Sequence, residues 1–284
     1  MDHQVPLSDQ ARADDGTRDG IHEVTADLGY QRLMLVNVAF FGTPGAGDRG
    51  WTLIDAGLTG TAPLIRDAAE DRFGKGARPA AIVLTHGHFD HVGGLTRLAE
   101  EWDAPIYAHR MEVPYLDGSA SYPPPDPSVG GMMAMLSPLF PRGPIDVSDR
   151  LYTLPDDGSV PGMPGWRWLA TPGHTDGHVS LWRASDRTLI SGDAVITTRQ
   201  ESAYAVALQS PEMHGPPAYF TPNWHAAHLS VQRLAALEPE LIVPGHGRAF
   251  AGEEMRAALH TLSDRFVELA VPKSGRYVDN RPTP

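Results

Sequence analysis

One short segment with three histidines and an aspartate constrains this chain more than any other feature. It reads Thr85-His86-Gly87-His88-Phe89-Asp90-His91 and directly follows the apolar run 80–84, which predicts a buried strand. Packing does not require so many imidazole and carboxylate groups at the end of a strand. Because both groups are metal ligands, the segment predicts half of a metal site.

The composition excludes several classes of protein. Among 284 residues, 23 Lys and Arg stand against 35 Asp and Glu, and the formal charge of −12 argues against a nucleic-acid or anionic membrane partner. No apolar run approaches the roughly 18 residues of a membrane span, and the polar start of the chain does not resemble a signal peptide. We therefore expect a cytoplasmic protein, monomer or homodimer, that acts on a small-molecule substrate without nucleic-acid or membrane partners.

Cysteine is absent from the sequence. Disulfides, thiolate metal ligands and a cysteine nucleophile are therefore excluded. Any metal ion must be held by histidine and carboxylate side chains.

Predicted strands and helices alternate along the chain, which indicates an α/β fold. The first half has a predicted hairpin of strands 33–41 and 51–57, helix 61–73, strand 80–84, helix 95–102 and strand 105–109. The second half has predicted strands 166–171, 179–183, 188–190 and 241–243, and helices 224–237 and 253–269. We expect a flexible N-terminal tail over 1–20, a single domain over 21–270 and a C-terminal tail over 271–284.

The segment 111–150 interrupts this alternation. It is rich in proline and contains an apolar group of side chains: Met132, Met133, Met135, Leu136, Leu139 and Phe140. One interpretation is a surface excursion packed by its own side chains. The other is a cap-like insertion over a pocket, because Met and Phe on a loop make adaptable apolar contacts.

Three further candidate ligands follow predicted strands in glycine-containing turns. His174 lies in Pro-Gly-His-Thr, Asp193 in Ser-Gly-Asp and His246 in Pro-Gly-His-Gly. Together with His86, His88, Asp90 and His91 they make a set of ligands that suits two metal ions rather than one. Zinc suits imidazole and carboxylate groups, and the same set would accept iron or manganese.

These motifs, in this order, resemble those of the metallo-β-lactamase-fold hydrolases over about residues 22 to 265. The resemblance implies a four-layer αβ/βα sandwich, in which two mixed sheets are flanked by helices and the metal site lies at the sheet edge. It also implies which residues hold the ions. His86, His88 and His174 would hold one ion, Asp90, His91 and His246 the other, and Asp193 would bridge them.

The resemblance implies supporting roles for two more residues. Asp55, in Leu-Ile-Asp-Ala-Gly, would orient a histidine ligand, although a carboxylate that caps a turn is the alternative. His178, in Gly-His-Thr-x-Gly-His, would support the site without binding metal. We interpret His109, His225 and His228 as ordinary surface or core histidines.

The chemistry follows from the charge of such a site. Two divalent cations, two aspartates and a bridging hydroxide leave about +1, and zinc can lower the pKa of bound water from 15.7 to about 7. A hydroxide held between the metals would then attack a carbonyl or phosphoryl group. Asp90 is the catalytic candidate that would return a proton to the leaving group.

The loop after Asp193 supplies the candidate substrate contacts, because its position places it over the site. These residues, each of which also has a packing alternative, are Arg199, Tyr204, His214, Tyr219 and Phe220.

The bridging aspartate favours the glyoxalase II and lactonase-like branch over true β-lactamases. The match to this branch is incomplete in two ways. Homoserine-lactone hydrolases carry a tyrosine at the position of Ile196. The basic C-terminal residues with which glyoxalase II holds glutathione are only scattered in this chain. We predict hydrolysis of a small ester, lactone or thioester by two metal ions. A phosphodiester or phosphotriester hydrolase is the alternative, and an iron-dependent sulfur or redox enzyme is a third.

Overall fold

The structure, a computed structural model, describes residues 4–14, 20–208 and 210–278, and the chain divides into two compact units. The N-terminal unit comprises Asp14–Tyr122 and Pro141–Trp168. The C-terminal unit comprises Met1–Ala13, Pro123–Phe140 and Leu169–Pro284. The single domain that we predicted over 21–270 stays a prediction. The parts of the predicted tails at 1–3, 15–19 and 279–284 lie outside the described residues.

The N-terminal unit is built on a mixed sheet of seven strands, which follow one another in chain order. The strands are β2 (His22–Thr25), β3 (Leu28–Leu33), β4 (Val36–Phe41), β5 (Thr52–Ile54), β6 (Ala81–Val83), β7 (Ile106–Ala108) and β8 (Leu151–Thr153). Neighbours from β2 to β5 are antiparallel, and those from β5 to β8 are parallel. Strands β5 and β6 therefore end at the same edge, where Asp55 and the histidine segment follow them.

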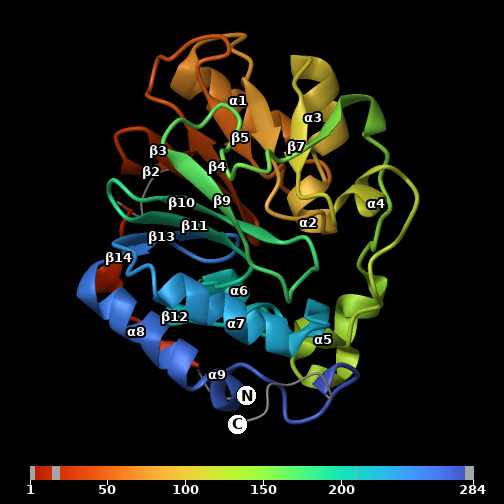
Figure 1. Ribbon diagram of the computed structural model, residues 1–284, viewed down its shortest axis with the longest axis vertical. Coiled ribbons are helices and arrows are strands. Elements are labelled where there is room, and N and C mark those ends of the chain that lie inside the picture. The colour runs from red at the N-terminus through yellow and green to blue at the C-terminus, as the bar shows by residue number, and fades with distance from the viewer. Residues whose placement is uncertain (1–3, 15–19, 209, 279–284) are drawn as a thin grey trace. The chain divides into compact units, whose positions relative to one another are not determined.

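The helices of the N-terminal unit lie beside this sheet (Figure 1), and apolar residues of its α-helices belong to one core with the strands. The helices are α1 (Ala62–Phe73), α2 (Phe89–Val92), α3 (Leu95–Trp102) and α4 (Val113–Leu116), with the short 3-10 helix η4 (Ser148–Arg150). Buried residues of α3 recur at helical spacing, from Leu95 through Leu98 to Trp102. The Trp51 ring stacks on Phe73 with centroids 4.6 Å apart and meets the edge of Trp102 at 5.4 Å, so one aromatic cluster joins the sheet to both helices.

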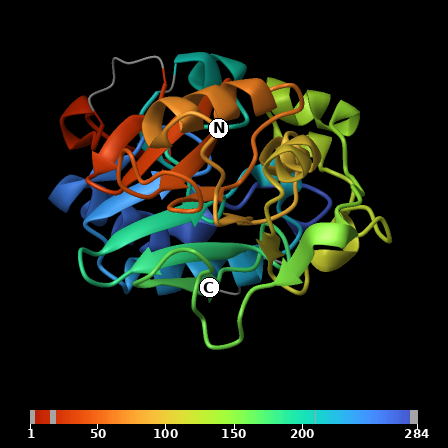
Figure 2. The same ribbon diagram turned by 90° about the horizontal axis from the view of Figure 1, so that it is seen from above.

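The C-terminal unit contains a second mixed sheet, with strand order β14-β13-β11-β10-β9. Its strands are β9 (Trp166–Ala170), which spans the boundary between the units along the chain, β10 (Val179–Arg183), β11 (Thr188–Gly192), β13 (Leu241–Pro244) and β14 (Phe250–Ala251). Strands β10, β11 and β13 run side by side in Figures 1 and 2, and β11 is parallel to β13. A separate pair joins β1 (Val5–Pro6) to β12 (Glu212–Met213). The segment that we predicted to be an N-terminal tail thus contributes a strand.

The helices of the C-terminal unit are α5 (Met132–Leu136), α6 (Ala203–Leu208), α7 (Trp224–Ala235), α8 (Gly252–Asp264) and α9 (Phe266–Leu269), with 3-10 helices η1 (Asp9–Ala11), η2 (Pro127–Val129), η3 (Ser137–Leu139) and η5 (Ala218–Phe220). Helix α7 begins where the Asn223 side chain accepts a hydrogen bond from Ala226 N at 3.0 Å. The closing helix that we predicted over 253–269 is interrupted at Arg265, so that prediction was wrong in its continuity.

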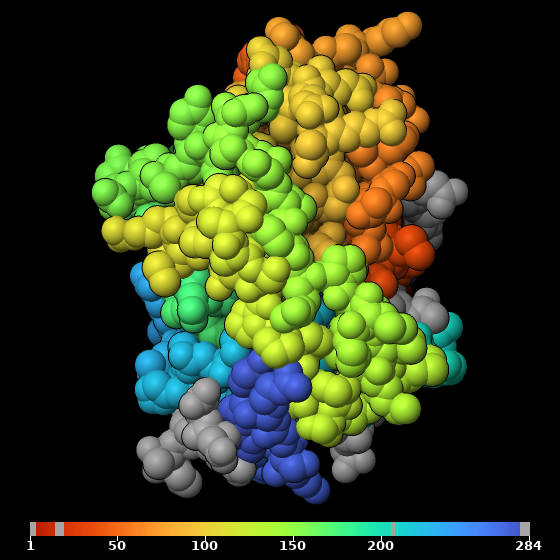
Figure 3. Space-filling model, turned by 90° about the vertical axis from the view of Figure 1, so that its right-hand side faces the viewer, coloured from red at the N-terminus to blue at the C-terminus, as the bar shows by residue number. Residues whose placement is uncertain are grey.

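Residues 123–140, in the middle of the predicted cap-like insertion, pack within the C-terminal unit. The lime-coloured surface of this segment lies beside the blue C-terminal segment in Figure 3, where Arg276 Nη1 donates to Pro125 O at 3.1 Å. Asp126 N donates to Tyr219 O at 2.8 Å. Gly131 has a φ of +95°, and an added Cβ would lie 2.3 Å from Glu201 O, so only glycine permits this approach.

The predicted mixed α/β fold with two mixed sheets and flanking helices is confirmed. The predicted strand 33–41 is wrong in one detail, because β3 ends at Leu33 and a tight turn with Met34 at a φ of 62° precedes β4. No glycine or proline marks this turn in the sequence. No helix within the described residues is both long and apolar enough to cross a membrane.

Candidate metal centre

In the N-terminal unit, the Asp55 carboxylate fixes both ends of the histidine segment. Its Oδ1 accepts a hydrogen bond from Thr85 N at 2.8 Å, and its Oδ2 accepts one from Thr85 Oγ1 at 2.7 Å. The same Oδ2 lies 2.8 Å from Nδ1 of His91. Since Nδ1 of His91 is held by the carboxylate, Nε2 is the nitrogen that this ring can offer to a metal ion.

The first two histidines lie at the spacing of ligands that share an ion. His86 Nε2 and His88 Nδ1 are 3.1 Å apart. Two ligand atoms held about 2.0–2.1 Å from a tetrahedral zinc ion lie about 3.3 Å from each other. Asp90 and His91 follow on the single turn α2, and a ligand atom of each lies within 4.8 Å of the other.

Backbone contacts fasten this segment to the chain after β5. Ala56 N donates to His91 O at 2.7 Å, and Gly93 N donates to Gly57 O at 2.7 Å. An added Cβ at Gly93 would lie 2.1 Å from Thr59 N, so the close approach requires glycine. The sequence pattern of glycines after the histidines therefore has a steric cause.

In the C-terminal unit, one carboxylate oxygen lies close to two histidines. Asp193 Oδ2 is 3.1 Å from Nε2 of His246 and 3.4 Å from Nε2 of His174. All three side chains are buried. The resemblance to the metallo-β-lactamase fold assigns these histidines to different ions, and Asp193, which is close to both, would be the residue that the two ions share.

His178 supports Asp193 through the backbone. Its Nε2 accepts a hydrogen bond from Asp193 N at 2.9 Å, and its Nδ1 lies 2.8 Å from Thr171 Oγ1. Because Nε2 is an acceptor, the neutral ring carries its proton on Nδ1. The supporting role of His178 stays a prediction, with which this contact is compatible.

The donor set fits divalent metal ions. Each of the predicted ligands is at most 8% exposed, and each unit places imidazole nitrogens and carboxylate oxygens at ligand spacing. Buried polar groups are costly unless they are satisfied, and imidazole with carboxylate suits zinc, iron or manganese. The predicted ligands in the N-terminal unit are His86, His88, Asp90 and His91, and those in the C-terminal unit are His174, Asp193 and His246.

The predicted substrate contacts lie in different environments. Arg199 is half-buried, and Tyr204 is 73% exposed. Tyr219 and Phe220 are buried on η5, and each ring centroid lies 6.3 Å from that of Phe140. These residues stay predictions as substrate contacts.

His214 is held in a buried ion-pair cluster. Its Nε2 lies 3.3 Å from Glu201 Oε2 and 3.7 Å from Glu212 Oε1. Burial opposes a charge on this ring, but the two carboxylates raise the pKa of His214, and the His214 cation in turn holds the pKa of buried Glu201 below its usual range. These contacts are compatible with the packing alternative, and His214 stays a prediction as a substrate contact.

The histidines interpreted as ordinary have contacts or exposure that need no metal. The His109 ring meets Trp168 at 5.5 Å, and the His228 ring stacks on Phe266 at 5.0 Å. His225 is exposed on α7.

Two residues that contact the histidine segment were missed in the sequence. Glu112 and Tyr122 both accept a hydrogen bond from Gly87 N, at 2.9 Å each. They lie in the irregular segment after β7, where no ligand motif or period marks them. Nothing in the sequence indicates that these two side chains bind the backbone of Gly87.

Comparison with known proteins gives the family. The family model described as "Metallo-beta-lactamase superfamily" matches residues 33–246. The chain is 47% identical over 247 residues to "Probable metallo-hydrolase YflN" of Bacillus subtilis, covering 87% of this chain and 90% of that protein. The chain belongs to the metallo-beta-lactamase superfamily.

Solved structures agree in fold. A protein described as the first B3 metallo-beta-lactamase with an active-site glutamic acid aligns with a TM-score of 0.60 at 20% identity, covering 94% of this chain and 96% of that one. The di-iron-bound form of TTHA1623 aligns with a TM-score of 0.50 at 24% identity, covering 85% and 96%. At these identities the likeness supports the metallo-beta-lactamase fold, and the resemblance seen in the sequence is confirmed at the level of the superfamily.

Replacing Asp55 by Asn tests its role in this superfamily member. Asn tolerates the left-handed backbone of residue 55, where φ is 60°, but its amide NH₂ cannot accept the bonds that Oδ2 accepts from Thr85 and His91. We expect D55N to remain folded and to bind zinc about 10–100-fold more weakly in a chelator competition.

Asp103→Asn is the matched control, because Asp103 also has a left-handed backbone, with φ of 48°, but pairs with Arg150 on the surface. Zinc affinity should be unchanged in this variant. Equal affinities of D55N and the wild-type protein would contradict the role of Asp55.

Proposed function

We propose that this chain is a metal-dependent hydrolase that uses two divalent ions to cleave a small ester, lactone or thioester. The observation that carries the proposal is the position of Asp193 Oδ2, 3.1 Å from His246 Nε2 and 3.4 Å from His174 Nε2. A carboxylate oxygen close to two histidines that are assigned to different ions suits a two-ion site with a shared ligand. Membership of the superfamily supports the hydrolase class.

Bound divalent ions would polarise the scissile carbonyl group and lower the pKa of water near it. The chain's own residues would fix the geometry of this chemistry. Asp55 holds the ring of His91, and His178 holds the backbone of Asp193. Asp90, which is 8% exposed, is the proposed proton donor to the leaving group.

Zinc is the proposed metal, because histidine and carboxylate ligands without cysteine suit it. Iron and manganese accept the same ligands. A structural neighbour, TTHA1623, is described in a di-iron-bound form, so iron is the alternative to zinc that metal analysis must test. Direct metal analysis distinguishes these ions.

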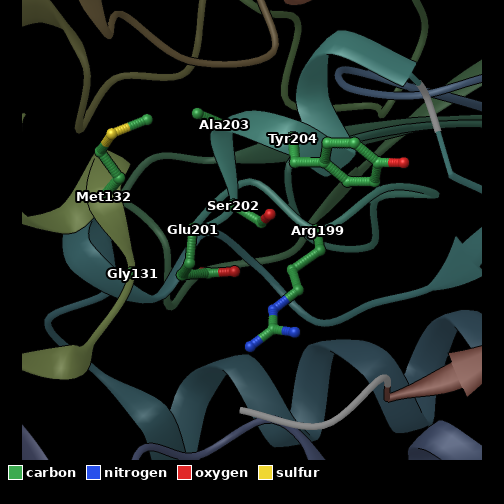
Figure 4. Close-up of a pocket in the computed structure, with 7 residues that line it drawn as sticks. All are labelled: Gly131, Met132, Arg199, Glu201, Ser202, Ala203 and Tyr204. Carbon is green, nitrogen blue, oxygen red and sulfur yellow. The ribbon is translucent and has the colours of Figure 1, made fainter.

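The surface beside Arg199 is the proposed place for part of the substrate. A cavity of about 340 Å³ is lined by Gly131, Met132, Arg199, Glu201, Ser202, Ala203 and Tyr204 (Figure 4). No described residue provides an ion-pair or hydrogen-bond partner for the Arg199 guanidinium, and Met132, which lines the same cavity, is 57% exposed. A cation next to apolar surface suits a substrate with a negative group on an apolar chain.

This cavity belongs to the loop that follows the proposed bridging aspartate. Thr197 N donates to His246 O at 3.0 Å, so the loop is fastened to the segment of a proposed ligand two residues before Arg199. Glu201 O accepts from Met133 N at 3.2 Å, which brings α5 to the same loop. These contacts support a binding role for the segment 123–140, the middle of the predicted cap-like insertion.

A substrate panel tests the proposed function. Zinc-loaded protein should hydrolyse members of the lactone, ester or thioester classes, and a chelator should remove the activity. β-Lactams and phosphoesters should react more slowly. A His246→Ala variant purified in the same way controls for contaminating hydrolases.

Two results would contradict the proposal. Turnover of phosphodiesters or phosphotriesters alone would favour the alternative hydrolase. No hydrolysis by zinc-, iron- or manganese-loaded protein would favour sulfur or redox chemistry on the same fold.

Replacing Arg199 by Gln tests the cavity. We expect the KM for p-nitrophenyl hemisuccinate, which carries a negative acyl chain, to rise about tenfold, the equivalent of about 1.4 kcal/mol for a hydrogen bond to a charged group. The KM for neutral p-nitrophenyl butyrate, with an acyl chain of the same length, should not change. Arg97→Gln, at a residue whose side chain is 63% exposed on α3, is the control. Equal effects on both esters would rule out charge recognition by Arg199.

A further inference from the structure

The peptide between His86 and His88 has its own pair of hydrogen-bond acceptors. Gly87 N donates to Glu112 Oε2 and to Tyr122 Oη, each at 2.9 Å. Both acceptors belong to the N-terminal unit, and neither is among the candidate ligands. The backbone between the first two proposed ligands is therefore held by side chains 25 and 35 residues away.

Glu112 and Tyr122 also bind each other. The Tyr122 hydroxyl donates to Glu112 Oε2, and Glu112 is fully buried. A buried carboxylate is costly without such donors, which gives this pair a defined geometry.

The side chains of Tyr122 and Leu116 leave no room for a larger residue at position 87. An added Cβ at Gly87 would lie 2.6 Å from Tyr122 Oη and 3.2 Å from Leu116 Cδ2. The Tyr122 ring meets the edge of the His88 ring at a centroid distance of 4.4 Å and stacks on Tyr115 at 3.8 Å. Tyr122 thus contacts both the backbone and one ring of the segment.

The pair is supported by its own surroundings. Glu112 N donates to His109 O at 2.8 Å at the start of α4, and Tyr122 N donates to Arg142 O at 2.9 Å. These bonds fix the acceptors through the backbone on both sides. The pair can therefore hold its geometry without help from a metal ion.

We propose that Glu112 and Tyr122 are positioning residues, which fix the Gly87 peptide and thereby aim the rings of His86 and His88 at one metal ion. The inference rests on the metal site of the proposed function. Rotation of this peptide would move both rings together, and ligands that lose such support typically bind metal 10–100-fold more weakly. Neither residue needs to contact substrate for this role.

Cobalt binding to the full chain tests the proposal without any substrate. Co²⁺ titrations of the wild-type protein, Glu112→Ala, Glu112→Gln and Tyr122→Phe should be followed by visible absorption, which reports ligand geometry. We expect E112A to lose about 10–100-fold in the affinity of its weakened site and to change the spectrum. E112Q should recover most of both properties, because its amide oxygen can still accept from Gly87 N. Y122F should fall between E112A and the wild-type protein.

Glu254→Ala is the matched control. Glu254 also accepts from a backbone N–H and a hydroxyl, those of Ser8, at 2.6 Å each, but it lies on α8. Its cobalt spectrum should equal that of the wild-type protein. If E112A does not fold, the faster amide exchange of Gly87 expected in Y122F decides the question.

The outcome is separate from that of the substrate panel. Wild-type affinity, spectrum and Gly87 exchange in folded E112A and Y122F would overturn the positioning role even if the enzyme hydrolyses esters. An altered cobalt spectrum in both variants would support it even if no substrate is found.

Discussion

The hydrogen bonds of the Asp55 carboxylate are the interaction on which the histidine segment depends. Strands β5 and β6 are parallel neighbours, so Asp55 and Thr85 leave the sheet at the same edge. The carboxylate binds Thr85 at the start of the segment and His91 at its end. The buried Asp55 side chain therefore fixes the conformation of an irregular loop that carries several proposed metal ligands. Its left-handed backbone is a cost that aspartate tolerates better than most residues.

In the C-terminal unit, different groups hold a proposed ligand in place. Asp193 follows β11, and its backbone N–H is held by His178 rather than by a carboxylate. This arrangement leaves Oδ2 close to His174 and His246. In each unit a second residue holds one proposed ligand, Asp55 for His91 and His178 for Asp193, as in the outer shells of metal sites. Positions of ligands at strand ends follow from the sheets, while their orientations follow from these supporting contacts.

The sequence predicted those features that depend on local pattern. Helix α3 begins at Leu95 and ends at Trp102 as its apolar spacing indicates, and the ligand motifs follow strands as expected. The sequence did not predict features that depend on contacts between residues far apart in the chain. Nothing near Met34 marks the turn before β4, and nothing near Glu112 shows that its carboxylate binds the Gly87 peptide. Such contacts join residues far apart in the chain, and periodicity carries no information about them.

Counting the bound metal ions tests the central claim most directly. Purified wild-type protein, saturated with zinc and passed through a desalting column, should retain about two ions per chain, as a bridged site predicts. Asp193→Ala should retain one ion or none, because the oxygen between His174 and His246 is removed. A wild-type protein that saturates with a single ion, or an Asp193→Ala variant that keeps two with unchanged affinity, would contradict the account.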